Sequence, residues 1–291
     1  MNGIINLIKP KGISSFKCVS YIKKITGIKK VGHTGTLDPE AEGVLPICVG
    51  KATKIIDFIM TNNKEYEVRF KLGVVTDTYD LEGSVLKEYD YSNITEQMIM
   101  NSINKFVGDI KQVPPMYSAL KKNGVRLYEL ARQGIEIERP ARDIKIYSIS
   151  DINIDIPYVT MKVNCSKGTY IRSLCYDIGD DLGIGATMTD LKRTANGKFN
   201  IKDGICMNDL TSENINDYII SMDEALNVFP AIYVDNYFSK LLMNGVKVNN
   251  PKITKEKLKE DVFYRVYNES SDFIGIGLYK NGAFKMDKLL L

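Results

Sequence analysis

The sequence of 291 residues contains no tryptophan, a single histidine, and five cysteines that never form a CxxC pair. Metal sites of the HExxH or Cys2His2 type need at least two histidines, and His33 is the only one here. The cysteines are scattered as Cys18, Cys48, Cys165, Cys175 and Cys206. We therefore expect no disulfides, no metal and no cofactor.

Long apolar runs are also missing. No segment approaches the roughly 18 consecutive apolar residues of a membrane-spanning helix. The first residues, MNGIINLIKPKG, lack the order of basic end, apolar run and small-residue cleavage site that defines a signal peptide. We therefore expect a cytoplasmic protein with no membrane partner. The GxSxG elbow and the Walker phosphate loop are absent too, so an enzyme of this sequence must rely on its own side chains.

Negative charge is absent from the first 37 residues, and the first carboxylate of the chain is Asp38. The same stretch contains seven lysines: Lys9, Lys11, Lys17, Lys23, Lys24, Lys29 and Lys30. Over the whole chain, 39 basic and 36 acidic residues leave a net charge of +3, too small to indicate a nucleic-acid partner by itself. The lysines are either the solvated face of a helix or a phosphate-binding surface, and the charge pattern alone favours the first.

The apolar pattern predicts a mixture of helices and strands. Ser14 and Ser15 are N-cap candidates before a helical repeat at positions 16, 19, 22 and 25. Residues 64–72 alternate between apolar and charged side chains, as in a half-buried strand. A second strand is expected at 159–165, followed by a helix over 171–182. Together these elements indicate an α/β (α+β) protein.

Two segments interrupt this pattern. About residues 110–140 form a basic excursion from the core that is suited to gripping phosphate. Its cations include Lys121, Lys122 and Arg126. Beyond Phe229 the chain is composed of short strands broken by Gly and Asn. We therefore divide it into a domain of residues 1–229 and a small β-rich domain of residues 230–291.

Asp38 lies in the glycine- and proline-rich segment GHTGTLDPEAEGVLP, residues 32–46. This segment follows neither the helical nor the strand period, and such loops often carry functional side chains on a rigid scaffold. Taken alone, Asp-Pro is a frequent start of a turn, so the pattern favours a turn or capping role for Asp38 over a catalytic one. His33 is open to the same two interpretations.

GHTGTLDPEAEGVLP resembles the catalytic motif of the TruB family of pseudouridine synthases. Five further blocks resemble that family in the same order: KEYEVRFKLG, VTDTYDLEG, PPMYSALK, YELARQG and CSKGTYIRSL. The resemblance covers roughly residues 3 to 200. It implies that the chain isomerises uridine to pseudouridine at position 55, in the T-loop of tRNA.

The resemblance assigns the chemistry to Asp38, as nucleophile or general base. Uracil must leave C1′, rotate and rejoin through C5. This reaction needs one carboxylate that attacks the sugar or the base, or removes a sugar proton, and is regenerated at the end. The acylal, Michael and glycal routes stay open. Tyr66 is implied to stack on the flipped uracil and to assist removal of the C5 proton. Arg172 is implied to hold Asp38 ionised, since an adjacent positive charge lowers an aspartate pKa.

Other matching positions imply contacts with the RNA. His33 would enter the space that the flipped base leaves, while Tyr170 and Leu191 would line the uracil pocket. Lys9 would lie close to that pocket, and a structural role is equally open for it. Extruding a base costs a few kcal/mol, and stacking on an aromatic ring returns about 1–3 kcal/mol. The phosphates of the T-arm would meet Lys23, Lys24, Lys121, Lys122 and Arg126.

The family fold is an α/β domain on a mixed, mainly antiparallel sheet, followed in many members by a small β domain of the PUA type. This chain has few landmarks of that second domain beyond FIGIGLYKNG. We expect a monomer, with a possible secondary role in tRNA folding. Two other functions stay open. One is the catalytic subunit of a guide-RNA particle, whose extended tail and basic terminal extensions this sequence lacks; the other is a non-catalytic RNA chaperone.

Overall fold

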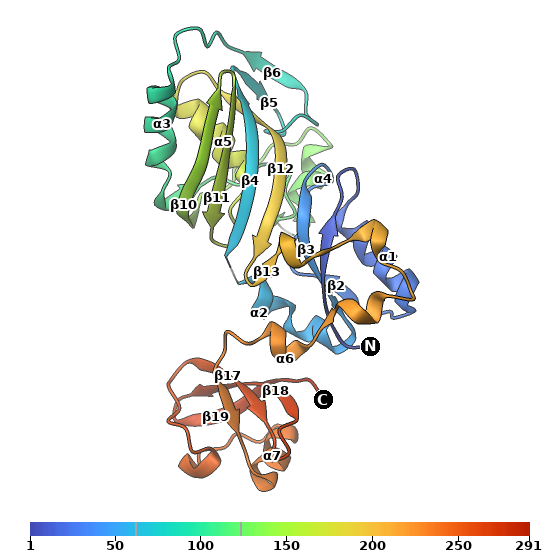
Figure 1. The fold of residues 1–291 in the computed structure, drawn as a ribbon. Helices are drawn as coiled ribbons and strands as arrows, with labels where there is room; N and C mark the ends of the chain where they lie inside the picture. The colour runs from blue at the N-terminus through green and yellow to red at the C-terminus, as the bar shows by residue number, and fades with distance from the viewer. Residues whose placement is uncertain (62, 123) are drawn as a thin grey trace.

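A computed structural model describes residues 1–61, 63–122 and 124–291, and in this part of the chain eleven strands form one large sheet (Figure 1). These strands are β1 (Gly3–Lys9), β2 (Val31–His33), β3 (Glu42–Val49), β4 (Lys64–Leu72), β7 (Gly108–Gln112), β10 (Arg142–Asp155), β11 (Tyr158–Cys165), β12 (Ala186–Asn196), β13 (Phe199–Asn200), β14 (Ile205–Cys206) and β15 (Ile219–Ile220). Their main order is β14-β1-β3-β12-β4-β11-β10-β7. The pairs β1–β14 and β3–β12 are parallel and the other pairs antiparallel, which confirms the predicted mixed, mainly antiparallel sheet.

Helices and short hairpins surround this sheet. The helices are α1 (Ser15–Thr26), α2 (Ile56–Met60), α3 (Glu96–Lys105), α4 (Leu127–Ala131), α5 (Ile171–Asp181), α6 (Met222–Ala225) and α7 (Asn236–Met243). The 3-10 turns are η1 (Gly50–Ile55), η2 (Ile201–Asp203), η3 (Met207–Asp209), η4 (Ile215–Tyr218) and η5 (Pro251–Ile253). Two hairpins pair β5 (Val74–Thr76) with β6 (Val85–Glu88), and β8 (Lys121–Lys122) with β9 (Val125–Arg126).

The two halves of the sheet are buried differently. In β4, Val68 and Phe70 point into the core while Glu67 and Arg69 are exposed, which confirms the half-buried strand. In β3 nearly every residue is buried, because both faces of that strand are covered. Since side chains alternate between the faces, Leu45 and Ile47 pack in the cluster that includes α1, whereas Val44 and Cys48 pack toward the C-terminal sheet.

Helices α1, α3 and α5 contribute to the same core cluster, α1 over one half of the sheet and α3 and α5 over the other (Figure 1). Ser14 caps α1 as predicted, accepting a hydrogen bond from the backbone N of Lys17 at 3.2 Å. The predicted apolar stripe was wrong at Phe16, which is 67% exposed. The buried face is centred on Ser15, Val19 and Ile22, and Phe16 is turned more than a quarter of a turn away from it. Within the described ranges, no helix is long and apolar enough to cross a membrane.

A second sheet follows, with strands β16 (Ala231–Tyr233), β17 (Val262–Tyr267), β18 (Phe273–Lys280) and β19 (Ala283–Leu289). This confirms the predicted β-rich C-terminal part. Aromatic rings connect it to α2: Phe58 of α2 meets Phe229 and Phe263 edge to face, with centroids 5.7 and 5.0 Å apart. Arg265 also binds Asp223 at 2.7 Å. The boundary at 229/230 and the PUA assignment stay proposals.

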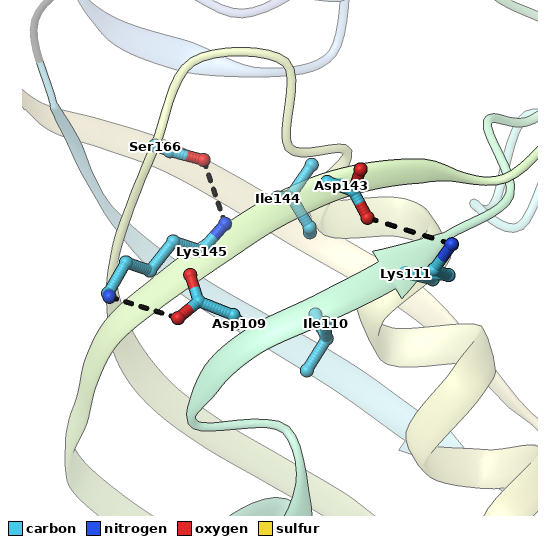
Figure 2. Close-up of a pocket in the computed structure, with 7 residues that line it drawn as sticks. All are labelled: Asp109, Ile110, Lys111, Asp143, Ile144, Lys145 and Ser166. Carbon is cyan, nitrogen blue, oxygen red and sulfur yellow. Dashed lines mark hydrogen bonds and ion pairs between the residues drawn. The ribbon is translucent and has the colours of Figure 1, made fainter.

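A shallow pocket of about 470 Å³ lies on β7 and β10, at the edge of the large sheet (Figure 2). Lys145 pairs with Asp109 at 3.2 Å and Lys111 with Asp143 at 3.9 Å. Most of these side chains are strongly exposed, so solvent screens both pairs and they contribute little stability. Asp109 and Lys111 lie on the edge strand β7, where charged side chains discourage pairing with another sheet.

Core packing gives a stability prediction with a matched control. Phe70 is fully buried and Phe16 is mostly exposed. Replacing Phe70 with alanine should lower the free energy of unfolding by about 3–5 kcal/mol, because it removes buried surface and leaves a cavity. Phe16→Ala should change it by no more than about 0.5 kcal/mol. Urea unfolding followed by circular dichroism measures both, and equal losses would contradict the assigned packing.

Candidate active site

The loop that carries Asp38 is fastened on both sides. Before it, Ser15 Oγ donates to the carbonyl of Leu37 at 2.9 Å and accepts from the Leu37 backbone N at 2.8 Å. After it, Lys9 Nζ donates to the carbonyl of Pro39 at 2.9 Å, and to two carbonyls of the β1–α1 loop. An ammonium has three donors, and all three of Lys9 are used here. The geometry supports the structural alternative for Lys9, as an anchor of the Asp38 loop.

Arg172 is the centre of the site. It lies in the first turn of α5 and is only 6% exposed. Its Nε lies 3.1 Å from Asp38 Oδ2, and its Nη1 lies 3.0 Å from Asp80 Oδ2. The remaining donors bind the carbonyls of Thr78 and Tyr117 at 3.2 and 2.8 Å. One guanidinium therefore joins α5 to three other segments that are distant in sequence.

The pKa of Asp38 departs from the expectation based on Arg172 alone. Burial raises the pKa of this carboxyl, and the nearby charge of Asp80 raises it further, while Arg172 lowers it. The net direction is upward. Arg172 thus limits the rise rather than setting the sign, because burial has the larger effect on this pKa. The Asp38 side chain still exposes 36% of its surface, so it is accessible to a reactant.

A second buried cation, Arg193, lies beneath the loop. Its Nε donates to the carbonyl of Val44 at 2.7 Å and its Nη2 to the carbonyl of Gly35 at 3.1 Å. Arg193 is directly opposite Tyr66 in the pairing of β12 with β4. Burial raises the pKa of the Tyr66 phenol, and the charge of Arg193 opposes that shift. The phenol therefore stays protonated at neutral pH.

His33 is at the end of β2, where its Nδ1 accepts a hydrogen bond from the backbone N of Gly35 at 3.3 Å. Burial lowers its pKa, and the charge of Arg193 lowers it further. The imidazole is accordingly neutral at pH 7. It presents an uncharged polar ring close to the Asp38 loop.

A cavity of about 120 Å³ opens at Asp38 and is lined by Leu191, among others. Drug-sized ligands occupy pockets of about 300–1,000 Å³, so the room here is limited. Tyr66 and Tyr170 are close to the site but do not line this cavity, and the Tyr66 ring is only 8% exposed. Tyr170 is fixed at the start of α5, where its backbone N and O both bind the side chain of Gln112, at 2.8 and 3.0 Å.

The predicted phosphate-binding residues are not among those that line this cavity. Lys23 and Lys24 lie in the last turn of α1, about 12 Å along the helix axis from Ser15. Lys121, Lys122 and Arg126 are exposed on the β8–β9 hairpin, where Arg126 Nη1 donates to Tyr128 Oη at 3.0 Å. These five residues are not brought together with Asp38. Their contact with RNA stays a proposal.

Sequence reasoning missed Asp80 and Arg193. Asp80 is 7% exposed. It belongs to the block VTDTYDLEG, which the sequence analysis included. A loop has no regular repeat of buried positions, so the sequence does not show that Asp80 rather than the neighbouring Asp77 is buried. For Arg193 a signal existed. It follows Leu191 by two positions, so a strand places both on the same face. In the described part of the chain, no group of three or more His, Cys, Asp or Glu side chains is arranged to hold a metal ion.

Comparison with known proteins identifies the family. The profile described as "TruB family pseudouridylate synthase (N terminal domain)" matches residues 23–171. The profile described as "tRNA pseudouridylate synthase B C-terminal domain" matches residues 172–227. The chain therefore belongs to the TruB family of pseudouridylate synthases, which confirms the resemblance seen in its motifs.

The similarity to individual proteins extends over the whole chain. A protein named tRNA pseudouridine synthase B from Clostridium tetani is 56% identical over 291 residues, with 100% of both chains covered. One of the same name from Alkaliphilus oremlandii is 43% identical and covers 97% of this chain and 94% of its own. The structure titled "Crystal Structure of a Cbf5-Nop10-Gar1 Complex" has a TM-score of 0.76 at 26% identity, covering 99% of this chain and 85% of that one.

The backbone at Gly43 gives a prediction about the loop. Gly43 has φ of +108°, and a Cβ there would lie 2.2 Å from the carbonyl oxygen of Arg193. Gly245 has φ of +77° with open space around its Cβ position. Both alanine variants share the left-handed strain of about 1–2 kcal/mol. Gly43→Ala should lose about 3 kcal/mol or more in urea unfolding, because the clash is added. Similar losses for the two variants would refute the close approach.

The pKa of Asp38 is testable by carbon-13 NMR titration of its carboxyl group. We expect a midpoint above the ordinary aspartate value, because burial raises it. Arg172→Met should move the midpoint to still higher pH, since the guanidinium lowers the pKa. Arg172→Lys keeps the charge and should move it less. A midpoint that is lower in Arg172→Met than in the wild type would contradict this assignment.

Proposed function

We propose that this chain isomerises uridine to pseudouridine at position 55, in the T-loop of tRNA, with Asp38 as the reacting carboxylate. The observation that carries the proposal is the arrangement at the small cavity, where Arg172 holds a partly exposed Asp38 next to Leu191. Membership of the family and the names of its relatives support the reaction.

The reaction is an isomerisation and needs no oxidant or reductant. The N1–C1′ bond breaks, uracil turns, a C5–C1′ bond forms, the proton on C5 leaves and N1 gains a proton. Asp38 either attacks C1′ or C6, or removes the C2′ proton, and is regenerated in each route. All three routes need the ionised carboxylate. Arg172 promotes this form because it opposes the rise in pKa that burial causes.

The other site residues have supporting roles in this proposal. Tyr66 stacks on the flipped uracil, after a movement that uncovers its ring. Its raised pKa argues against the phenolate form as the base that takes the C5 proton. His33 enters the space that the base leaves, and as a neutral ring it does so without the cost of desolvating a charge. Tyr170 and Leu191 contact the base.

The remaining assignments concern the RNA and the domains. Residues 1–229 form the catalytic domain, and its basic excursion at about 110–140 grips the T-arm through the β8–β9 hairpin. The small domain of residues 230–291 is PUA-like and binds RNA as well. The protein acts as a monomer in the cytoplasm, where its tRNA substrate is available, and without a cofactor.

A guide-RNA-dependent subunit is the alternative with a specific observation in its favour, the TM-score of 0.76 to the Cbf5-Nop10-Gar1 structure. Relatives at 56% identity over the full chain favour the tRNA enzyme. Purified protein alone should convert an unmodified tRNA transcript, with the product at position 55. Turnover that requires added guide RNA and protein subunits would support the alternative instead.

Asp38→Asn tests both catalysis and the chaperone alternative. This variant should abolish tritium release from tRNA labelled at uridine C5, because an amide neither attacks carbon nor accepts the proton. Binding to the tRNA should change little. Asp181→Asn is a matched control, since Asp181 lies far along α5 and pairs with Lys105. Substantial tritium release by Asp38→Asn would overturn the assignment, and a wild type that binds without release would favour a chaperone.

A further inference from the structure

The cavity at Asp38 is strongly acidic for an enzyme that acts on RNA. Four carboxylates line it: Asp38, Glu40, Asp80 and Glu82. Among the described residues that line it, the only cation is Lys11. A flipped nucleotide brings its phosphates to this opening, where the four carboxylates repel them. Lys11 is therefore the one lining group that can attract a phosphate at the cavity itself.

Lys11 is already held in place by an ion pair. Its Nζ hydrogen-bonds to Oδ1 of Asp190. Lys11 belongs to the loop between β1 and α1, two residues beyond the buried Lys9, and Asp190 precedes Leu191 on β12. The pair thus connects two elements across one side of the cavity. This contact raises the pKa of Lys11 and lowers that of Asp190, so both groups are charged at neutral pH.

Exposure makes this ion pair exchangeable. The Lys11 and Asp190 side chains expose 44% and 47% of their surface, in contrast to 7% for Arg172 and 9% for Asp80. An exposed ion pair contributes little stability, because water and salt screen it. A phosphate oxygen can replace the Asp190 carboxylate on Lys11 without leaving a buried charge unpaired. The Arg172 pairs have no such freedom.

We propose that Lys11 positions a phosphate next to the flipped uridine, and that Asp190 occupies the phosphate's place on Lys11 in the free protein. The proposal rests on the proposed function, because it takes an RNA nucleotide as the substrate. Lys11 is a positioning residue and takes no part in bond making. Asp190 is a competitor of the substrate, so removing it strengthens binding.

Two measurements test the role of Lys11 together. They are the steady-state turnover of a tRNA transcript and the direct binding of a T-arm stem-loop. Lys11→Gln should raise KM and the stem-loop Kd by about 3- to 10-fold with a smaller effect on kcat. The slope of log Kd against log salt should fall by about 0.7 to 0.9, the loss of one phosphate contact. Asp190→Asn should lower Kd by about twofold or more at low salt, because Lys11 is freed.

The opposite signs separate this role from a structural one. If the ion pair only holds the fold together, Lys11→Gln and Asp190→Asn break the same contact and change KM and Kd in the same direction, which would overturn the proposal. Lys105→Gln and Asp181→Asn are the matched controls, since that exposed ion pair lies between α3 and α5. If the wild type binds the stem-loop without turnover, the proposed function fails. The Kd values of Lys11→Gln and Asp190→Asn still decide the role of Lys11 in that case.

Discussion

The shared guanidinium of Arg172 is the interaction on which the site depends. It contacts Asp38 from the loop after β2, Asp80 from the hairpin of β5 and β6, and the Tyr117 carbonyl from the basic excursion. Each of these segments is a loop without its own period. Removing one member would leave a buried or half-buried charge unpaired, which costs far more than the intact contact contributes. The chemistry and the local fold are therefore one network.

Two further buried cations support the same loop through backbone carbonyls instead of carboxylates. Lys9 holds it at Pro39, and Arg193 holds it at Gly35 and at Val44 of β3. Carbonyl oxygens satisfy a cation without adding negative charge. Of these two cations, Lys9 lowers the pKa of Asp38 and so opposes part of the rise that burial causes.

Sequence reasoning succeeded where a period or a motif exists. The alternation in β4 and the cap at Ser14 follow from local rules, and the family motif implied the contact between Asp38 and Arg172 that the structure contains. It failed where tertiary contacts decide. Arg172 is a charged residue in an amphipathic helix. Its burial depends on two carboxylates from other segments, which the helical repeat of apolar residues does not reveal. Phe16 fits an apolar spacing, yet the helix begins where that position faces solvent.

The separation of charge on this protein suits a reaction that takes a base out of an RNA loop. The lysines of α1 and the β8–β9 hairpin lie outside the cavity, whereas carboxylates line the cavity itself. Phosphate is attracted to the first region and repelled by the second, while a neutral uracil enters the second without that penalty. The modest net charge of +3 is compatible with the proposed RNA contacts, because RNA loops are recognised by shape and local charge rather than by total charge. Lys11 lines the cavity, and in our proposal it holds a phosphate there while the base continues inward.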